Sequence, residues 1–147
     1  MINLAGKRLV SKDNVLMGEA EESLRVLLAD DSAPLCASLA SLLRKCTAIR
    51  VVGQVQDGLE AVELVRTLKP HVLVTDLRMG NVTGIEVLRR LREEHLYPIV
   101  IVFTSHREDE YAETCKALGA RYFFTKPQYE RVIETIKQLQ RGGIPTL

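Results

Sequence analysis

Three things are scarce in this sequence: an excess of either charge, paired cysteines and long apolar runs. The 20 Lys and Arg residues nearly balance the 19 Asp and Glu residues, which leaves a formal net charge of +1. Proteins that bind nucleic acid directly, or that lie on a membrane surface, usually carry a clear basic excess. We therefore expect no direct nucleic-acid binding and no membrane contact.

The three cysteines are odd in number and include no Cys-x-x-Cys pair: they are Cys36, Cys46 and Cys115. Neither a disulfide framework nor a zinc site is indicated, and three small apolar side chains in a reducing cytosol explain them. No apolar run reaches the ~18 residues of a membrane-spanning helix. These absences predict a cytoplasmic protein.

What the sequence does have is a regular alternation of patterns. Its 147 residues are about one domain's length. From Leu24 onward, short apolar runs typical of strands alternate with amphipathic patterns typical of helices. We predict strands at 24–29, 50–55, 71–76, 98–104 and 121–125, and helices that begin at Pro34 and span 59–68, 85–94, 108–118 and 128–140.

This order of elements predicts an α/β fold in which a βα unit is repeated five times. Continuous apolar strands are expected in a parallel sheet that is buried on both faces. The prediction is a doubly wound, five-stranded parallel sheet with helices on both sides. In the first helix, Leu35, Leu39, Leu42 and Leu43 are expected on the inward face.

The chain divides into three parts in this interpretation. Residues 1–23 lack sustained periodicity and are interpreted as a tail, with Met17 as an alternative start of translation. Residues 24–141 form the domain, and 142–147 are a short C-terminal tail. Because only seven residues follow Gln140, we expect no separate output domain after it.

Polar side chains stand at the ends of four predicted strands. Asp30 and Asp31 follow the first strand, Asp76 ends the third, Thr104 ends the fourth and Lys126 follows the fifth. Alone, an Asp at such a place is usually a helix cap or turn former, and a Thr or Lys is usually surface decoration. Ligands of open α/β sheets bind at the carboxyl ends of the strands, however, so the joint placement favours a site.

The chemistry of these side chains points to phosphoryl transfer. Three clustered carboxylates repel one another unless a cation lies among them, and hard oxygen ligands of this kind suit Mg²⁺. A carboxylate can act as the nucleophile that forms an acyl phosphate. A cation and a nearby Lys would offset the charge on a transferring phosphoryl group. The expected cofactor is therefore Mg²⁺.

Six segments, in order along the chain, carry a family resemblance. They are Val26-Leu27-Leu28-Ala29-Asp30-Asp31, Val72-Leu73-Val74-Thr75-Asp76-Leu77-Arg78-Met79, Gly84, Ile101-Val102-Phe103-Thr104, Gly119-Ala120 and Lys126-Pro127. With these segments the chain resembles the receiver domain of response regulators in two-component signalling, in its stand-alone form. The resemblance covers nearly all of residues 24–140. It implies a flavodoxin-like fold with strand order 2-1-3-4-5.

The resemblance also implies a role for each carboxylate. Asp76 corresponds to the phosphoacceptor. Asp31 corresponds to a direct Mg²⁺ ligand, and Asp30 to a residue that holds the metal through water. Asp76 itself and the backbone carbonyl of Arg78 would be the remaining protein ligands.

Other positions match the family's switch and tuning residues. Thr104 corresponds to the switch hydroxyl and Lys126 to the partner of the phosphoryl group. Phe123 stands at the aromatic switch position, where it lacks the hydroxyl of a Tyr. Arg78 and His106 each stand two residues after a key side chain, at positions that tune the lifetime of the phosphoryl group in this family.

The implied function is a phosphorylation-controlled binding module rather than an enzyme. The phosphoryl group would come from a histidine kinase or a phosphotransfer protein. Phosphorylation would reshape the surface of the helix 108–118, the strand 121–125 and the helix 128–140, which a downstream protein partner reads. A homodimer through this surface is a further hypothesis, with a solvated face as its alternative, because charges of both signs lie there: Glu108, Asp109, Glu110, Glu113, Arg121, Arg131 and Lys137.

Alternatives from other classes are weaker. A phosphatase or phosphotransferase with an Asp nucleophile commonly has a second carboxylate two residues after the first, where this chain has Arg78. In a flavin carrier of similar fold, Asp30 and Asp31 would repel the phosphate of the cofactor. A receiver-like module that binds partners without phosphorylation would not need all five key side chains, and all five are present.

Overall fold

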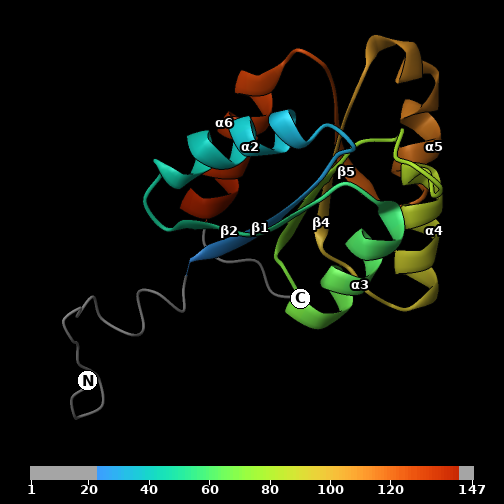
Figure 1. Cartoon of the computed structure of the whole chain (residues 1–147), viewed down its shortest axis with the longest axis horizontal. Coiled ribbons are helices and arrows are strands. Elements are labelled where there is room, and N and C mark those ends of the chain that lie inside the picture. Colours follow the sequence, from blue (N-terminus) through green and yellow to red (C-terminus); the bar gives the residue numbers. More distant parts are fainter. Residues whose placement is uncertain (1–22, 143–147) are drawn as a thin grey trace.

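Five parallel strands form one sheet in the order β2-β1-β3-β4-β5 (Figure 1). The computed structural model describes residues 23–142, so the predicted tails at 1–23 and 142–147 fall almost wholly outside the described residues. The parallel sheet and the strand order 2-1-3-4-5 are confirmed. The strands are β1 (Leu24–Ala29), β2 (Ile49–Val55), β3 (Val72–Thr75), β4 (Ile99–Thr104) and β5 (Ala120–Thr125).

Helices cover both faces of the sheet, as predicted. Two of them lie against one face and three against the other (Figure 1). The first pair is α2 (Ala33–Arg44) and α6 (Tyr129–Arg141), and the second group is α3 (Gly58–Leu68), α4 (Gly84–Glu93) and α5 (Ala112–Ala117). No helix within residues 23–142 combines the length and apolar character that crossing a membrane requires.

Alternate residues of the central strands point into two separate apolar layers. In β1, Val26 and Leu28 pack with the inward residues of α2 and α6. Leu27, between them, packs with those of α3 and α4 on the other face. This alternation follows from the two-residue period of a strand. It explains why the central strands read as unbroken apolar runs in the sequence.

Two local predictions were wrong. Leu42 was expected to face inward, but its side chain is exposed, and α2 buries Cys36, Leu39, Ala40 and Leu43 instead. These four positions follow the helical period more closely than the run of leucines does.

The second wrong prediction concerns the helix at 108–118. The chain there begins as a 3₁₀ helix, η1 (His106–Tyr111), and only then continues as the short α5. The tighter 3₁₀ turn brings Glu108 inward, where its carboxylate bonds to Arg78. A contact between distant parts of the chain thus accompanies the change in helix type.

His71 is a buried histidine at the start of β3, far from the carboxyl ends of the strands. Its Nδ1 accepts a hydrogen bond of 3.0 Å from the backbone N–H of Arg25. Burial, with the charge of Arg25 as a smaller cause, lowers the pKa of His71 below its ordinary value of 6.5. The ring is therefore neutral in the folded protein and ties β1 to the chain before β3.

We predict that His71 makes the folded protein less stable in mild acid. Below pH 6.5 the unfolded chain takes up a proton at this ring before the folded chain does, so the free energy of unfolding falls as the pH falls. Urea denaturation between about pH 7.5 and pH 5.5 measures the slope. The variant His71→Asn, which keeps an uncharged acceptor, should show a shallower slope, and an equal slope would contradict the prediction.

Candidate functional site

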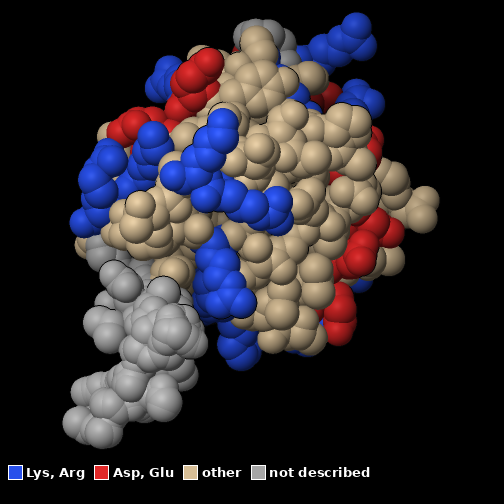
Figure 2. Space-filling model, turned by 60° about the vertical axis from the view of Figure 1, so that its left-hand side comes forward, with Lys and Arg blue, Asp and Glu red and all other residues tan. Residues whose placement is uncertain are grey.

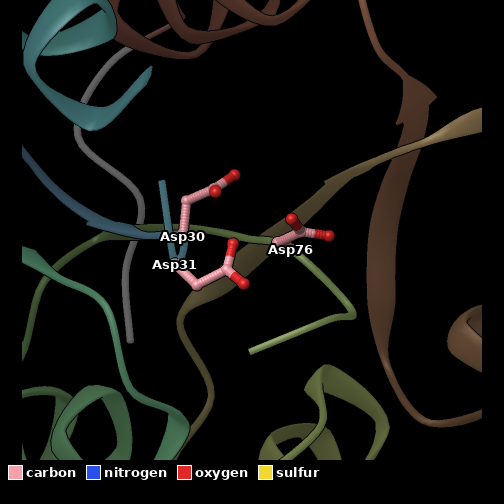
Figure 3. Close-up of side chains that lie close together, drawn as sticks. All are labelled: Asp30, Asp31 and Asp76. Carbon is pink, nitrogen blue, oxygen red and sulfur yellow. The ribbon is translucent and has the colours of Figure 1, made fainter. Parts of the chain in front are cut away.

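Three carboxylates meet at the carboxyl ends of β1 and β3 (Figure 3). Oxygen atoms of Asp30, Asp31 and Asp76 all lie within 4.8 Å of one another. Asp30 and Asp76 are buried, whereas Asp31 is exposed. The sheet topology explains this meeting, because β1 and β3 are neighbours and Ala29 is paired with Thr75 in the residue before each carboxylate.

Lys126 bridges two of the carboxylates. Its Nζ lies 2.8 Å from Oδ2 of Asp30 and 3.0 Å from Oδ2 of Asp76. The backbone N–H of Lys126 donates to the carbonyl oxygen of Thr104, which fixes the loop after β5 to the end of β4. One ammonium group thus joins the ends of three strands.

The protonation of this pair follows from burial and from the bridge. Burial raises the pKa of Asp30, and the hydrogen bond from Lys126 opposes that shift without cancelling it. Burial by itself would lower the pKa of Lys126, but its bonds to Asp30 and Asp76 outweigh burial, so the pKa is raised. Lys126 is therefore held as a cation at the centre of the site.

Asp76 is held by donors on both of its oxygens. Oδ1 accepts hydrogen bonds from the backbone N–H groups of Leu77 and Arg78, at 2.6 and 3.2 Å. The fully buried Thr104 hydroxyl donates to the same atom at 2.7 Å. Oδ2 takes the bond from Lys126. This carboxylate is fixed in position by groups that all donate hydrogen bonds to it.

The donor set fits a hard divalent cation. In this cluster one ammonium group, that of Lys126, offsets three carboxylates, which leaves an excess of negative charge. Carboxylate oxygens with one exposed member, Asp31, match the preference of Mg²⁺ for few carboxylates and several waters. The cluster is therefore a suitable place for Mg²⁺, next to the fixed carboxylate of Asp76.

The structure brings together the five side chains that were predicted to meet, and it places the other predicted residues around them. Phe123 is partly buried and packs against the apolar layer that contains Val102 and Cys115. The backbone of His106 begins η1, but its side chain lies outside what the structure describes. The backbone N–H of Arg78 bonds to Asp76, while its side chain turns elsewhere.

An ion pair that the sequence did not reveal lies at the rim of the site. Nε of Arg78 bonds to Oε2 of Glu108 at 2.8 Å, and the two side chains are 73% and 7% exposed. Glu108 was predicted on an exposed charged surface, and the structure corrects this, because the carboxylate is buried against Arg78. No spacing rule links residues 30 positions apart, one in the loop after β3 and the other in η1.

A hollow of about 530 Å³ opens beside this ion pair. Asp31 and Arg78 line it on the side of the carboxylates, and Glu108 and Tyr111 line it on the side of η1. A small phosphorylated molecule, or a side chain of a partner, has room to reach the cluster from here.

Gly84 lies directly against the backbone of Asp76 and Leu77, where no larger residue fits. A Cβ atom there would lie 2.4 Å from the carbonyl oxygen of Asp76 and 2.8 Å from Cα of Leu77. The N–H of Gly84 also donates to the carbonyl oxygen of Leu77 at 2.9 Å. The start of α4 is thus packed directly against the loop that carries Asp76.

We predict that Gly84→Ala destabilises the protein by about 1–3 kcal/mol, the usual cost of forcing extra volume into a packed place. Chemical denaturation measures the change. Gly142→Ala is the matched control, because the nearest atom to its added Cβ is 3.5 Å away. Equal stabilities of the two variants would show that the backbone near Asp76 yields easily.

Comparison with known proteins agrees with this geometry. The family described as "Response regulator receiver domain" matches residues 26–137. A protein-glutamate methylesterase/protein-glutamine glutaminase of Halalkalibacterium halodurans is 39% identical over 108 residues, which are 73% of this chain and 31% of that protein. A protein of the same name from Thermotoga maritima is 40% identical over 106 residues, 71% of this chain and 30% of that protein.

A solved structure gives the same result. The crystal structure of the response regulator domain of Thermotoga maritima CheB has a TM-score of 0.71 and 33% identity, and the match covers 85% of this chain and 98% of that one. The chain matches less than a third of the length of the two methylesterases. With its fold, its cluster of carboxylates and these matches, the chain belongs to the family of response regulator receiver domains.

Proposed function

We propose that Asp76 is the phosphoacceptor of this receiver and that Thr104 and Lys126 are its partners in phosphoryl transfer. One observation supports this most: Asp76 is fixed by Thr104 and two backbone N–H groups on one oxygen and by Lys126 on the other. Such an array keeps a carboxylate in place and leaves donors beside it for the oxygens of an incoming phosphoryl group.

The reaction follows from these positions. A carboxylate oxygen of Asp76 attacks the phosphorus, and the bond from phosphorus to the donor breaks as the new bond to oxygen forms. The donor is a phosphohistidine of a histidine kinase or phosphotransfer protein, and its imidazole leaves with the electron pair of the broken phosphorus–nitrogen bond. Lys126 and the Thr104 hydroxyl then donate to phosphoryl oxygens instead of to the free carboxylate.

Asp30, Asp31, Asp76 and the backbone carbonyl of Arg78 would hold Mg²⁺. When bound, the cation offsets negative charge on the phosphoryl group and on the carboxylates. The chain's own contribution is to keep Asp31 exposed to solvent and Asp30 tied to Lys126, so that the cluster accepts a cation without losing its geometry.

The output would pass through the surface of α5, β5 and α6. Thr104 leaves Oδ1 of Asp76 for a phosphoryl oxygen, which shifts the end of β4 toward the site and gives Phe123 room to move inward. This is a local change of charge that biases an element with two arrangements. A downstream protein partner, or a second copy of the chain, would bind the altered surface.

The charges on this surface remain compatible with the proposed homodimer, although fewer acidic side chains are exposed than the sequence suggested. Glu108 is withdrawn into its pair with Arg78. Arg131 lies over the ring of Phe124, 5.3 Å from its centre, and Arg121 lies 6.0 Å from the ring of Tyr122. Asp109, Glu110 and Glu113 remain exposed to meet such cations across a two-fold axis.

The activity in the names of the methylesterase relatives is not proposed for these residues. The chain matches only the part of those proteins that resembles a receiver. We propose that residues 24–141 act as a receiver whose only chemistry is the gain and loss of its own phosphoryl group. An Asp-nucleophile phosphatase is less well supported, because Arg78 takes the place of a second carboxylate and is engaged by Glu108.

We predict that the protein takes up one phosphoryl group from a small acyl phosphate in the presence of Mg²⁺. Intact mass spectrometry measures the uptake. Asp76→Asn should abolish it, because the amide is a poor nucleophile, whereas Asp57→Asn should not, because Asp57 caps the start of α3 outside the cluster. Equal uptake by the Asp76→Asn protein, or uptake unaffected by removal of Mg²⁺, would contradict the assignment.

Arg78 is proposed to set the lifetime of the phosphoryl group, and Glu108 to control Arg78. Glu108→Gln weakens the ion pair, so the guanidinium is released to reach the phosphoryl oxygens and to hinder an attacking water. We predict several-fold slower loss of phosphate than in the unaltered protein, followed by the decay of the phosphorylated mass. Adding Arg78→Ala to Glu108→Gln should remove the effect, and a lifetime unchanged by Glu108→Gln alone would refute the role.

A further inference from the structure

Basic side chains gather at the amino-terminal edge of the sheet, opposite the carboxylates. In a parallel sheet the connecting helices run back along the strands, so all of them end at this edge. Figure 2 shows Lys and Arg side chains gathered on the face that its view brings forward, with Asp and Glu mainly near the margins. The last turns of the helices contain Arg44, Arg66, Arg90, Arg92, Lys116 and Arg141.

Stabilisation of helix ends explains only part of this charge. A cation in the last turn of a helix interacts favourably with the helix dipole. Three further cations stand instead near the starts of strands: Arg25, Arg50 and Arg121. Lys69 follows α3 with a left-handed φ of 48°, which a glycine would adopt more easily. This end therefore carries more positive charge than its helices need.

Two apolar hollows open at the same end, on either side of Tyr97. Tyr97 is 63% exposed, the most exposed of the large hydrophobic side chains described. One hollow, of about 180 Å³, is lined by side chains that include Leu91 and Leu118. The other, of about 160 Å³, is lined in part by Val65 and Pro70. The segment Leu96-Tyr97-Pro98 forms the wall that both hollows share.

Each hollow has a cation at its edge. Lys69 lines the smaller hollow and Arg92 the larger. Neither forms an ion pair with another residue of the described part of the chain, whereas the nearby Glu63 and Glu94 are both bound by Arg66. Arg25 lies close to Lys69, because its Nη1 donates to the carbonyl oxygen of Leu68 at 2.6 Å. The hollows are thus apolar inside and positively charged at the rim.

We propose that this end of the molecule binds an acidic protein segment that carries large apolar side chains. Two such side chains would fill the hollows beside Tyr97, and the carboxylates between them would meet Lys69 and Arg92. An acidic segment complements the positive charge at the rim, and apolar anchors complement the lining of the hollows.

A nucleic acid fits this surface less well. The hollows are lined mainly by aliphatic and proline side chains, which offer little to a sugar–phosphate backbone. The exposed carboxylate of Glu93 lies just before Tyr97 and would repel a continuous row of phosphates. A peptide can place single carboxylates among the cations and avoid this position.

The test uses the full chain and a small set of fluorescent, synthetic twelve-residue peptides. Each peptide contains two Phe residues surrounded by Glu residues, and the spacing between the two Phe residues differs from one peptide to the next. Fluorescence anisotropy measures saturable binding. Two matched sets replace Glu by Gln or Phe by Ser, and a single-stranded oligonucleotide of equal charge serves as the polyanion. We expect binding of the Glu–Phe set alone, with backbone amide shifts centred on Leu96 and Tyr97.

Variants of the chain locate the surface. Reversal of the two cations at the hollows, Lys69→Glu with Arg92→Glu, should weaken binding at least about tenfold, as loss of complementary charge does. Tyr97→Ser should weaken it several-fold. Lys45→Glu, a single reversal at a residue that lines neither hollow, should have a much smaller effect. Lys69→Gly removes the side chain and suits the left-handed backbone at this position. If this variant binds more weakly without a lower melting temperature, the loss comes from the missing contact and not from impaired folding.

Several outcomes would overturn the proposal. They are the absence of saturable binding across the Glu–Phe set, equal binding of the Gln peptides, tighter binding of the oligonucleotide, or amide shifts that avoid Leu96 and Tyr97. Binding that occurs only after Glu19, Glu21 and Glu22 are replaced by Gln would also overturn it, since the chain's own acidic residues would then be the occupant. None of these results depends on phosphorylation of Asp76, so the proposal stands or falls separately from the proposed function.

Discussion

The bridge from Lys126 to Asp30 and Asp76 is the interaction on which the rest of the site depends. Like charges at the ends of β1 and β3 would push these neighbouring strands apart, and the ammonium group offsets that repulsion. Its backbone is in turn fixed to the end of β4 through Thr104. The ends of β1, β3 and β4 are therefore all bonded to one residue, through its side chain and its backbone, and Asp76 is held in place as a consequence.

The same bridge makes the site responsive to added charge. Lys126 is partly buried between two carboxylates and is well satisfied only while both are unmodified. A phosphoryl group on Asp76 would bring further oxygens for Lys126 and Thr104 to bond. Thr104 is fully buried and bonded to Asp76, so it has little freedom to respond unless the end of β4 moves with it. We therefore expect a change at Asp76 that involves only a few atoms to displace the end of β4 and the neighbouring Phe123.

Most of the fold and the centre of the site were predictable from the sequence, for physical reasons. Strands buried on both faces must be apolar throughout, and parallel strands bring their carboxyl ends together, so Asp30, Asp76 and Lys126 had to meet. The pair of Arg78 and Glu108 was not predictable, because one partner lies in the loop after β3 and the other in η1, and their relative position depends on the packed structure. The 3₁₀ turn of η1 was missed for the same reason, since its residues have no local pattern that separates it from an α-helix.

Opposite charges at the two ends of the sheet give the molecule two surfaces with different properties. β4 runs between them: Tyr97 and Pro98 precede its first residue, and Thr104 is its last. The strand is paired on both sides, to β3 and to β5, so it cannot slide by a register step without breaking two ladders. We therefore expect a shift of Thr104 to be absorbed near the carboxyl end rather than passed along the strand. A partner at the basic end would hold the receiver in place in either state of Asp76, and the state itself would be read at the opposite end.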